Sequence, residues 1–397
     1  MFDFSNIIEI MQTGGAADIL GWIIFFILLL FMTEIQTYLL IRSVTSFLDE
    51  VRVYDKLGRW FAISIILRTR KDLLEKVPGP DPASKALNLE KDEEFKKILD
   101  WSDEIINSFL INPVSLDPSG ILDRLDHLLD VRRKRFEGIA KRILGEGDEH
   151  LQKNLESTLE AASAIHYIYK LVEHIFRVGV NTKSYIYLMQ LKMLIPFLRE
   201  VVMSYYDALK AFQAGIPIGD SIGPMVAERL FGSEIEIDKE NNIVYSVNDI
   251  EGRYVLALKA YGPGSEVGKP GKVIKKLIEE LNGEVDMVIT VDAALRLESE
   301  KTGEVHVGVG AAIGDPGPEK YAIEEICTKY KIPLYAVVIK QSYVEAVTPM
   351  KKEIAEKVEL ALEKVKKLIL EEVEPDGKVI VAGIGNTVGV GNVPFGS

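Results

Sequence analysis

Three glycine-rich turns are the segments of this sequence best suited to hold a ligand. They occupy residues 261–271, 308–317 and 383–392, and each follows a short apolar run typical of a β-strand. Glycine lets the backbone approach an oxyanion closely, and the N-terminus of a following helix adds partial positive charge. We therefore expect a small anionic ligand, such as a nucleotide or phosphate compound. The predicted ligand-binding residues are Gly262, Gly264, Ser265, Gly268, Lys269, Gly314, Gly317, Gly383, Gly385, Asn386, Gly389 and Gly391.

The glycine turns match no nucleotide-binding signature. Lys269 follows Gly268 as in a phosphate-binding loop, but Pro270 stands where that loop needs serine or threonine. None of the turns has the G-x-G-x-x-G spacing with an acidic residue about 20 positions later. The ligand and any cofactor therefore stay unidentified, and ordinary structural turns are the alternative interpretation.

Two aspartates accompany these turns and could perform chemistry. Asp292 ends a predicted strand, and Asp315 lies in the second glycine turn. Two carboxylates at one ligand site can bind a metal ion or act as general acid and base. The structural alternatives are a cap or turn role for Asp292 and an Asp-Pro turn for Asp315. The single cysteine, Cys327, excludes a cysteine-ligated metal centre and an internal disulfide, and no metal ligand set is predicted.

The elements expected to position these residues form an α/β region at residues 233–397. Seven short apolar runs have strand character, and amphipathic helices separate most of them. Residues 234–247 have the pattern of a hairpin. Strands buried on both faces between helices indicate a three-layer domain with a mostly parallel sheet. Ligands bind such sheets beyond the carboxyl ends of the strands, where parallel strands would gather all three glycine turns.

The middle of the chain, residues 83–232, is predicted to be all-α. Apolar residues recur at helical spacing in two long helices that meet at Asn181 and Thr182. The dense basic run at residues 132–135 is interpreted as a solvated helix face, with phosphate, nucleic acid or lipid binding as the alternative. A Gly/Pro-rich elbow at residues 214–224 separates this region from the α/β region.

The N-terminal region contains a segment suited to a membrane. It begins at Ile19 and ends at Ile41, long enough as a helix to cross the hydrocarbon layer of about 30 Å. Cations follow this segment and none precedes it, so the positive-inside rule predicts an extracytoplasmic N-terminus and a cytoplasmic remainder. We expect residues 1–42 to hold the tail and transmembrane helix. Residues 43–82 would hold a juxtamembrane amphipathic helix and a Pro-rich linker.

The overall composition restricts the classes of partner. Lys and Arg total 47 against 60 for Asp and Glu, giving a net charge of −13. A chain this acidic is not expected to wrap nucleic acid over its whole surface. Abundant Glu and Lys beside few Gln is a bias found in hyperthermophiles.

Taken whole, the chain resembles an archaeal family of membrane-anchored proteins of unknown function. The features that carry the resemblance lie at residues 112–121, 217–224, 262–265 and 383–386. Residues 286–348 also resemble, more weakly, the germination protease and hydrogenase-maturation proteases. Those enzymes are α/β sandwiches that hydrolyse with acidic residues or a metal, and Asp292 falls where that family has an acidic residue. Asp315 matches the second acidic position only with an insertion.

Three functions follow from these patterns. The first is a single-pass membrane protein whose cytoplasmic α/β domain binds a small anionic ligand. The second is a metal-assisted or acidic hydrolase that uses Asp292 and Asp315. The third is a membrane-tethered scaffold that assembles as a homo-oligomer through its helical region.

Overall fold

A computed structural model describes residues 16–76, 89, 91–111, 113, 120–314 and 317–393. The predicted tail before residue 16, the Pro-rich linker around residues 78–82 and Asp315 lie outside the described residues. The chain forms two compact units. Unit 1 comprises residues 1–53 and 168–199, and unit 2 comprises residues 54–167 and 200–397.

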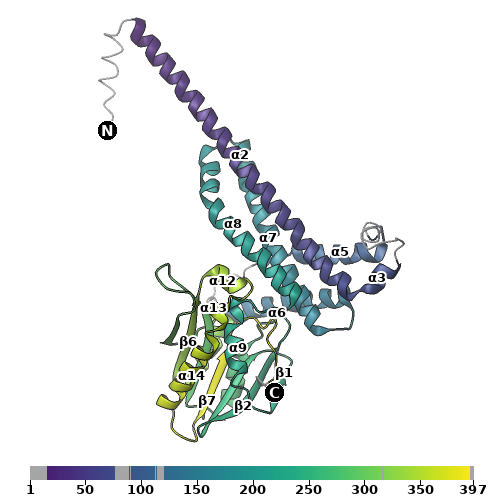
Figure 1. Cartoon of the computed structure of the whole chain (residues 1–397), viewed down its shortest axis with the longest axis vertical. Coiled ribbons are helices and arrows are strands. Elements are labelled where there is room, and N and C mark those ends of the chain that lie inside the picture. Colours follow the sequence, from purple (N-terminus) through teal and green to yellow (C-terminus); the bar gives the residue numbers. More distant parts are fainter. Residues whose placement is uncertain are drawn as a thin grey trace. The chain divides into compact units, whose positions relative to one another are not determined.

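Unit 1 is helical. It contains the first part of α2 (Ala16–Thr69), the end of α7 (Glu149–Asn181) and the start of α8 (Tyr185–Ala214). The predicted membrane segment and most of the predicted juxtamembrane helix are therefore one continuous helix, followed by the short helix α3 (Lys71–Lys76). Figure 1 shows α2 with its N-terminal half extending away from the other helices of this unit.

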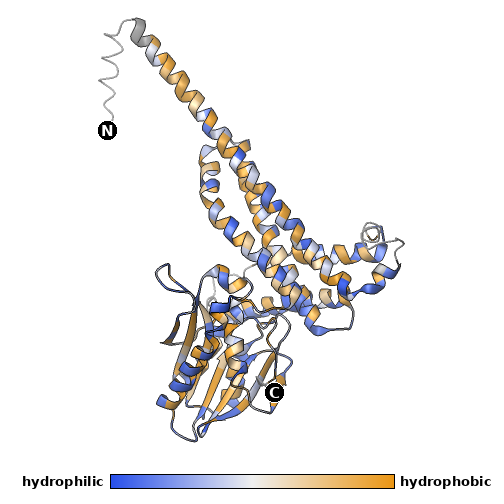
Figure 2. Ribbon diagram, in the orientation of Figure 1, coloured by the Kyte–Doolittle hydropathy of each residue, from blue (hydrophilic) through white to orange (hydrophobic). Residues whose placement is uncertain are grey.

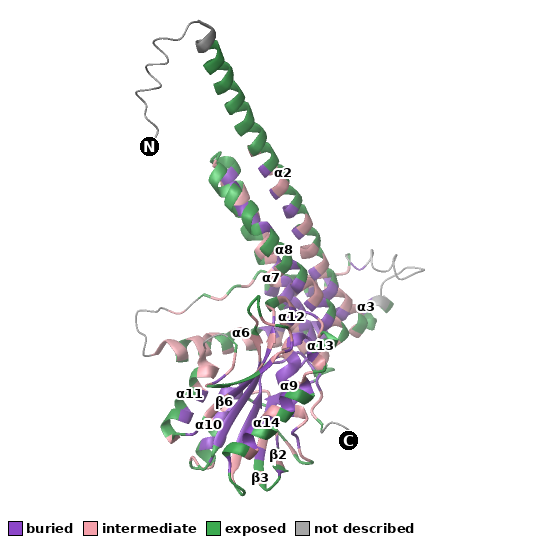
Figure 3. Ribbon diagram, turned by 60° about the vertical axis from the view of Figure 1, so that its left-hand side comes forward, coloured by how far each residue is buried: buried purple, intermediate pink, exposed green. Residues whose placement is uncertain are grey.

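The N-terminal half of α2 exposes its apolar side chains. Large apolar residues from Leu20 to Met32 are exposed, and Leu40 is the first buried residue of the helix (Figures 2 and 3). Among the described residues, the stretch Leu20–Thr69 is long and apolar enough to cross a membrane, judged by length and composition. The predicted apolar span is therefore present as a helix.

Unit 2 also has a helical part. Besides segments of α2, α7 and α8 it contains α5 (Glu93–Ile106), α6 (Ile121–Leu144), the 3-10 turn η2 (Gly219–Ser221) and α9 (Ile222–Glu228). The prediction of a helical middle region is confirmed. The two long helices also meet where the sequence indicated, because α7 ends at Asn181. The predicted domain boundaries stay predictions.

A seven-stranded sheet forms the centre of the α/β part of unit 2. Its strands are β1 (Ile235–Asp238), β2 (Ile243–Ile250), β3 (Arg253–Ala260), β4 (Met287–Leu295), β5 (Val305–Val309), β6 (Leu334–Gln341) and β7 (Lys378–Gly383). The order across the sheet is β1-β2-β3-β7-β4-β6-β5. Strands β3, β7, β4 and β6 are mutually parallel, whereas β1, β2 and β5 join by antiparallel pairings.

The prediction of a mostly parallel sheet is wrong, because the sheet is mixed. The predicted hairpin at its first edge is present as β1 and β2, but β2 is also antiparallel to β3. Two residues with positive φ, Glu251 at 49° and Gly252 at 79°, connect β2 to β3. Such a tight turn fits a two-residue hairpin and leaves no room for the crossover that a parallel pair needs.

Helices cover both faces of the sheet, which gives the predicted three layers. The helices α10 (Pro270–Glu280) and α11 (Pro318–Tyr330) pack on one face, and Cys327 lies buried in that layer, as predicted. The helices α9 and α14 (Val358–Glu372) pack on the other face. Two short helices, α12 (Tyr343–Val347) and α13 (Lys352–Ala355), precede α14.

Helix α9 approaches the sheet without a side chain in between. A Cβ atom added to Gly223 would lie 2.2 Å from the carbonyl oxygen of Ile384 and 2.3 Å from that of Val291. Val291 lies in the middle of β4 and Ile384 directly follows β7, so glycine at this position sets how closely α9 meets these strands. The same contact fixes the position of η2, which directly precedes α9.

We expect Gly223→Ala to lower the free energy of unfolding by about 2–3 kcal/mol, because backbone atoms must move to admit the methyl group. Thermal unfolding of the full-length chain in detergent measures this loss. Gly308→Ala is the control, since a Cβ atom there meets nothing within 4 Å. Equal melting temperatures for the two variants would contradict the prediction.

Candidate active site

Two aspartates from distant parts of the sequence meet at the carboxyl ends of the parallel strands. Asp292 lies in β4 and is 4% exposed. Asp220 lies in η2, which the close approach of α9 holds against the same strand ends. The side chains are near enough for the charge of Asp220 to act on Asp292. The structure therefore pairs Asp292 with a residue that the sequence analysis did not select.

Each aspartate is held by a backbone amide from a predicted glycine turn. The N–H of Gly314 donates to Oδ2 of Asp292 at 3.2 Å, and the N–H of Asn386 donates to Oδ2 of Asp220 at 2.7 Å. The second turn thus orients Asp292, and the third turn orients Asp220. The backbone N–H of Ala293 is a second donor to the Asp292 carboxyl group.

Burial and mutual repulsion govern the protonation of this pair. Removal from water raises the pKa of Asp292 well above its usual range, and the charge of Asp220 raises it further. Burial also raises the pKa of Asp220, although the Asn386 amide opposes that change. Two neighbouring carboxyl groups of this kind favour a state in which one is protonated and the other ionised.

The pair opens into a cavity of about 490 Å³, which we call the acidic cavity. Four predicted glycines, Gly268, Gly314, Gly317 and Gly385, line it together with Asp292. Its apolar wall consists of Leu125, Leu129, Val267, Pro270, Ala293, Ile313, Pro318 and Ile384. Glu319 and Lys320 also line it. The cavity therefore combines the acidic pair and two further charged residues with a mostly apolar surface, a composition typical of small-molecule and peptide sites.

The second glycine turn reaches the site by an unexpected path. Because β5 is antiparallel to β6, it ends at the amino edge of the parallel strands, where Gly310 donates to the carbonyl of Leu334 at 2.8 Å. The chain then returns along β4, since the N–H of Ala312 donates to Oγ1 of Thr290 at 2.8 Å. Gly314 completes this return at Asp292.

The first and third turns bind each other. Gly389 donates to the carbonyl of Pro263 and Thr387 to that of Glu266, each at 2.9 Å. Ser265 and Asn386 are also hydrogen-bonded through their side chains, at 2.8 Å. Five of the predicted ligand residues line neither the acidic cavity nor the second cavity described next. They are Gly262, Gly264, Gly383, Gly389 and Gly391.

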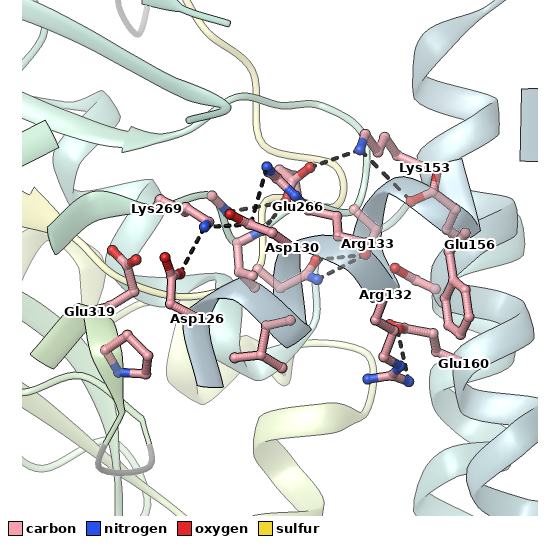
Figure 4. Close-up of a pocket in the computed structure, with 18 residues that line it drawn as sticks. Asp126, Asp130, Arg132, Arg133, Lys153, Glu156, Glu160, Glu266, Lys269 and Glu319 are labelled. Carbon is pink, nitrogen blue, oxygen red and sulfur yellow. Dashed lines mark hydrogen bonds and ion pairs between the residues drawn. The ribbon is translucent and has the colours of Figure 1, made fainter. Parts of the chain in front are cut away.

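A neighbouring cavity of about 370 Å³ lies between α6, α7 and the first turn (Figure 4). We call it the mixed-charge cavity, because ten charged residues line it: Asp126, Asp130, Arg132, Arg133, Lys153, Glu156, Glu160, Glu266, Lys269 and Glu319. Lys269, predicted as the counter-charge for an anion, pairs with Asp126 at 2.8 Å and with Asp130. Lys153 pairs with Glu137 at 2.7 Å and with Glu266 at 3.1 Å. Burial raises the pKa of Glu156 to about 8.

The N-terminus of α10 already holds a carboxylate from the protein. Oε2 of Glu319 accepts from the N–H groups of Gly271 at 2.7 Å and Lys272 at 3.2 Å. This is the position at which the sequence analysis expected an external anion. Together with Asp220 and Asp292, Glu319 gives all three glycine turns an internal acidic acceptor.

The sequence analysis missed Asp220 and Glu319. The elbow that contains Asp220 was noted only as a domain boundary, although its glycines on both sides of an aspartate were a usable signal. Asp315, the predicted partner of Asp292, lies outside the described residues. Within the described part of the chain, no three His, Cys, Asp or Glu side chains are arranged to hold a metal ion.

We expect Asp292→Asn to stabilise the protein increasingly as the pH rises. The folded-state pKa of Asp292 lies above its unfolded value of about 3.9, so the wild type loses stability between that value and the folded pKa. Asparagine does not titrate and avoids this loss. Melting temperatures of the full-length chain from pH 4.5 to 8.5 should diverge in favour of the variant.

The exposed Asp100→Asn is the matched control for this measurement, because the same chemical change is made in water. Its melting temperature should follow the wild type across the pH range. A constant difference between Asp292→Asn and the wild type would show that the carboxyl group of Asp292 does not titrate abnormally.

Two family models cover nearly the whole chain. The N-terminal domain model of a protein of unknown function (DUF1512) matches residues 18–215, and the C-terminal model of the same family matches residues 218–391. A comparison with curated proteins finds no match. The chain belongs to the DUF1512 family.

Proposed function

We propose that this protein is a membrane-anchored hydrolase in which Asp220 and Asp292 act as an acid–base pair. The observation that carries the proposal is the meeting of these two carboxyl groups in the acidic cavity. Perturbed carboxyl pairs in a cavity are a recognised mark of catalytic sites. The weak resemblance of residues 286–348 to acidic and metal-dependent proteases supports the same reaction class.

The proposed mechanism assigns one proton to the pair, on Asp292, whose pKa is raised well above its usual range. Ionised Asp220 removes a proton from a water molecule as the water oxygen attacks a carbonyl carbon. Asp292 has the strongly raised pKa and donates its proton to the carbonyl oxygen. As the tetrahedral intermediate collapses, Asp220 gives its proton to the leaving group and Asp292 takes a proton back from the hydroxyl group that becomes the product carbonyl. This sequence requires no metal ion.

The surroundings of the pair favour an uncharged substrate over an anionic one. Ionised Asp220 and Glu319 place negative charge on the acidic cavity, Lys320 also lines it, and its wall is otherwise mostly apolar. An amide or ester with an apolar group beside the scissile carbonyl fits this environment, because a phosphoester would meet repulsion from the carboxylates. We therefore propose a peptide or carboxylic ester as the substrate class.

The anchoring part of the proposal concerns α2. Its apolar segment, residues 19–41, would span the bilayer once, since the apolar surface exposed from Leu20 to Leu39 is costly in water. Arg42 and the cations after it would stay on the cytoplasmic side. The active site would then act in the cytoplasm, with the N-terminus outside.

Hydrolysis is tested with the full-length protein in nanodiscs, incubated with a peptide library and a set of carboxylic esters. We expect cleavage that falls at least 100-fold in Asp292→Asn and in Asp220→Asn, the usual loss when an acid or base is removed. Asp100→Asn should retain the wild-type rate. Undiminished cleavage in either site variant would refute the mechanism.

A second candidate function is the binding of a small anion in the mixed-charge cavity. The observation that favours it concerns Arg132 and Arg133, whose Nε atoms are buried and lack a hydrogen-bond partner among the described residues. Both side chains line this cavity (Figure 4). Phosphate oxygens suit guanidinium donors of this kind. Two ion pairs argue against this candidate, because they already occupy the arginines. Glu160 pairs with Arg132 at 3.2 Å, and Asp130 pairs with Arg133 at 3.7 Å.

Anion binding predicts that inorganic phosphate or ATP raises the melting temperature of the wild type. Arg133→Gln should lose this increase, because one donor to the anion is removed. Arg135→Gln is the matched control, since Arg135 pairs with Glu104 outside the cavity. No increase with either compound, or an equal increase in both variants, would eliminate this candidate.

A further inference from the structure

The turn between α7 and α8 exposes an unusual amount of apolar surface within unit 1. We call residues 177–197 the α7–α8 tip. Met193 is 73% exposed, Ile186 63% and Phe197 61%. Further exposed apolar or aromatic side chains are Val180, Tyr185, Tyr187, Met189 and Leu194. An exposed apolar patch of this extent marks an interaction site more often than a free surface.

The start of α8 buries only a narrow stripe. Leu188, Leu191 and Ile195 are buried at helical spacing, and the residues between them are mostly exposed. A soluble surface helix carries polar side chains on its outer face. Here the outer face is apolar instead, and the described residues of unit 1 leave it exposed (Figure 3).

The charge of the tip identifies the chemistry of its partner. Residues 175–199 contain no acidic side chain, whereas Arg177, Lys183, Lys192 and Arg199 are basic. This segment is therefore positively charged in a chain whose net charge is −13. Exposed apolar and tyrosine side chains combined with lysines are characteristic of segments that rest on anionic membranes.

The tip also lies at the height of α2 where the apolar segment ends, as contact with the same membrane face requires. Arg199 of α8 pairs with Glu50 of α2 at 2.9 Å, and its guanidinium lies over the Phe47 ring. The two helices run in the same direction (Figures 1 and 3). Both helices rise by the same distance per residue. The start of α8 therefore lies at the level of α2 near Gln36, roughly 20 Å along the helix axes from the Arg199–Glu50 pair. That is the end of the apolar segment at residues 19–41.

We propose that the α7–α8 tip rests in the headgroup layer of the anionic membrane face from which α2 emerges. This inference rests on the proposed anchoring by α2. The apolar side chains enter the boundary between headgroups and acyl chains, and the tyrosines and lysines lie at the level of the headgroups. A second copy of the chain is disfavoured as the partner, because it would present the same positive tip.

Depth-dependent fluorescence tests this arrangement in the full-length chain. Met193→Cys is labelled with an environment-sensitive dye in a Cys327→Ala background, and the protein is placed in nanodiscs of neutral lipid or of neutral lipid with phosphatidylglycerol. We expect a blue shift of the emission and quenching by brominated lipid, both stronger with phosphatidylglycerol. A label at the exposed Lys239 should show neither change.

The lysines provide the charge test. Lys183→Gln and Lys192→Gln should each lower the ratio of docked to undocked tip in anionic nanodiscs about fivefold, because each cation near such a surface contributes about that factor. Lys301→Gln is the matched control, since Lys301 is exposed and belongs to unit 2. An equal ratio in all three variants would overturn the electrostatic part of the proposal.

A label at Leu28→Cys separates failure of this inference from failure of the anchoring. Lipid quenching at residue 28 but not at residue 193 would overturn tip docking and leave the anchor intact. Absence of quenching at both positions would overturn both proposals. A blue shift at residue 193 without lipid quenching, together with dependence on the number of chains per nanodisc, would assign the tip to a second copy.

Discussion

The parallel alignment of β3, β7, β4 and β6 is the constraint on which the rest of the candidate site depends. Their carboxyl ends lie at one edge, so the turns that follow β3 and β7 are adjacent whatever their side chains. Helix α9 then crosses this edge at a distance that only Gly223 permits. This packing brings the half-buried Asp220 close to the buried Asp292.

Burial of two acidic groups is unfavourable unless protons or hydrogen bonds offset it. The glycine turns supply those hydrogen bonds through the amides of Gly314 and Asn386. Their backbone N–H groups, which would suit an external anion, instead hold the protein's own carboxylates. Glu319 does the same at the first turn of α10. The chemistry of the edge is therefore acidic, although its backbone geometry resembles that of an anion site.

Much of the architecture followed from the sequence alone. All seven strands, the junction of α7 and α8, the buried position of Cys327 and the apolar segment of α2 are local properties that periodicity and hydropathy reveal. The antiparallel direction of β2 relative to β3 could not be predicted from the sequence, because the tight connection at Glu251 and Gly252 has no strong turn signature. Asp292 was selected because it ended the predicted strand, although β4 continues to Leu295. Asp220 was missed because its partnership with Asp292 arises from tertiary packing, which spacing does not encode.

The path of residues 310–314 has an evolutionary consequence. Ile313 and Gly314 line the acidic cavity, and Gly314 orients Asp292, yet the segment belongs to no strand after Gly310. A change of length or side chain there leaves the register of the sheet intact, because surface segments tolerate insertions that strands do not. Duplicated copies of such a gene could thus diverge in what they accept while retaining the same pair of carboxyl groups. Under the proposed function, selectivity would then vary in a segment outside the strands that hold the sheet together.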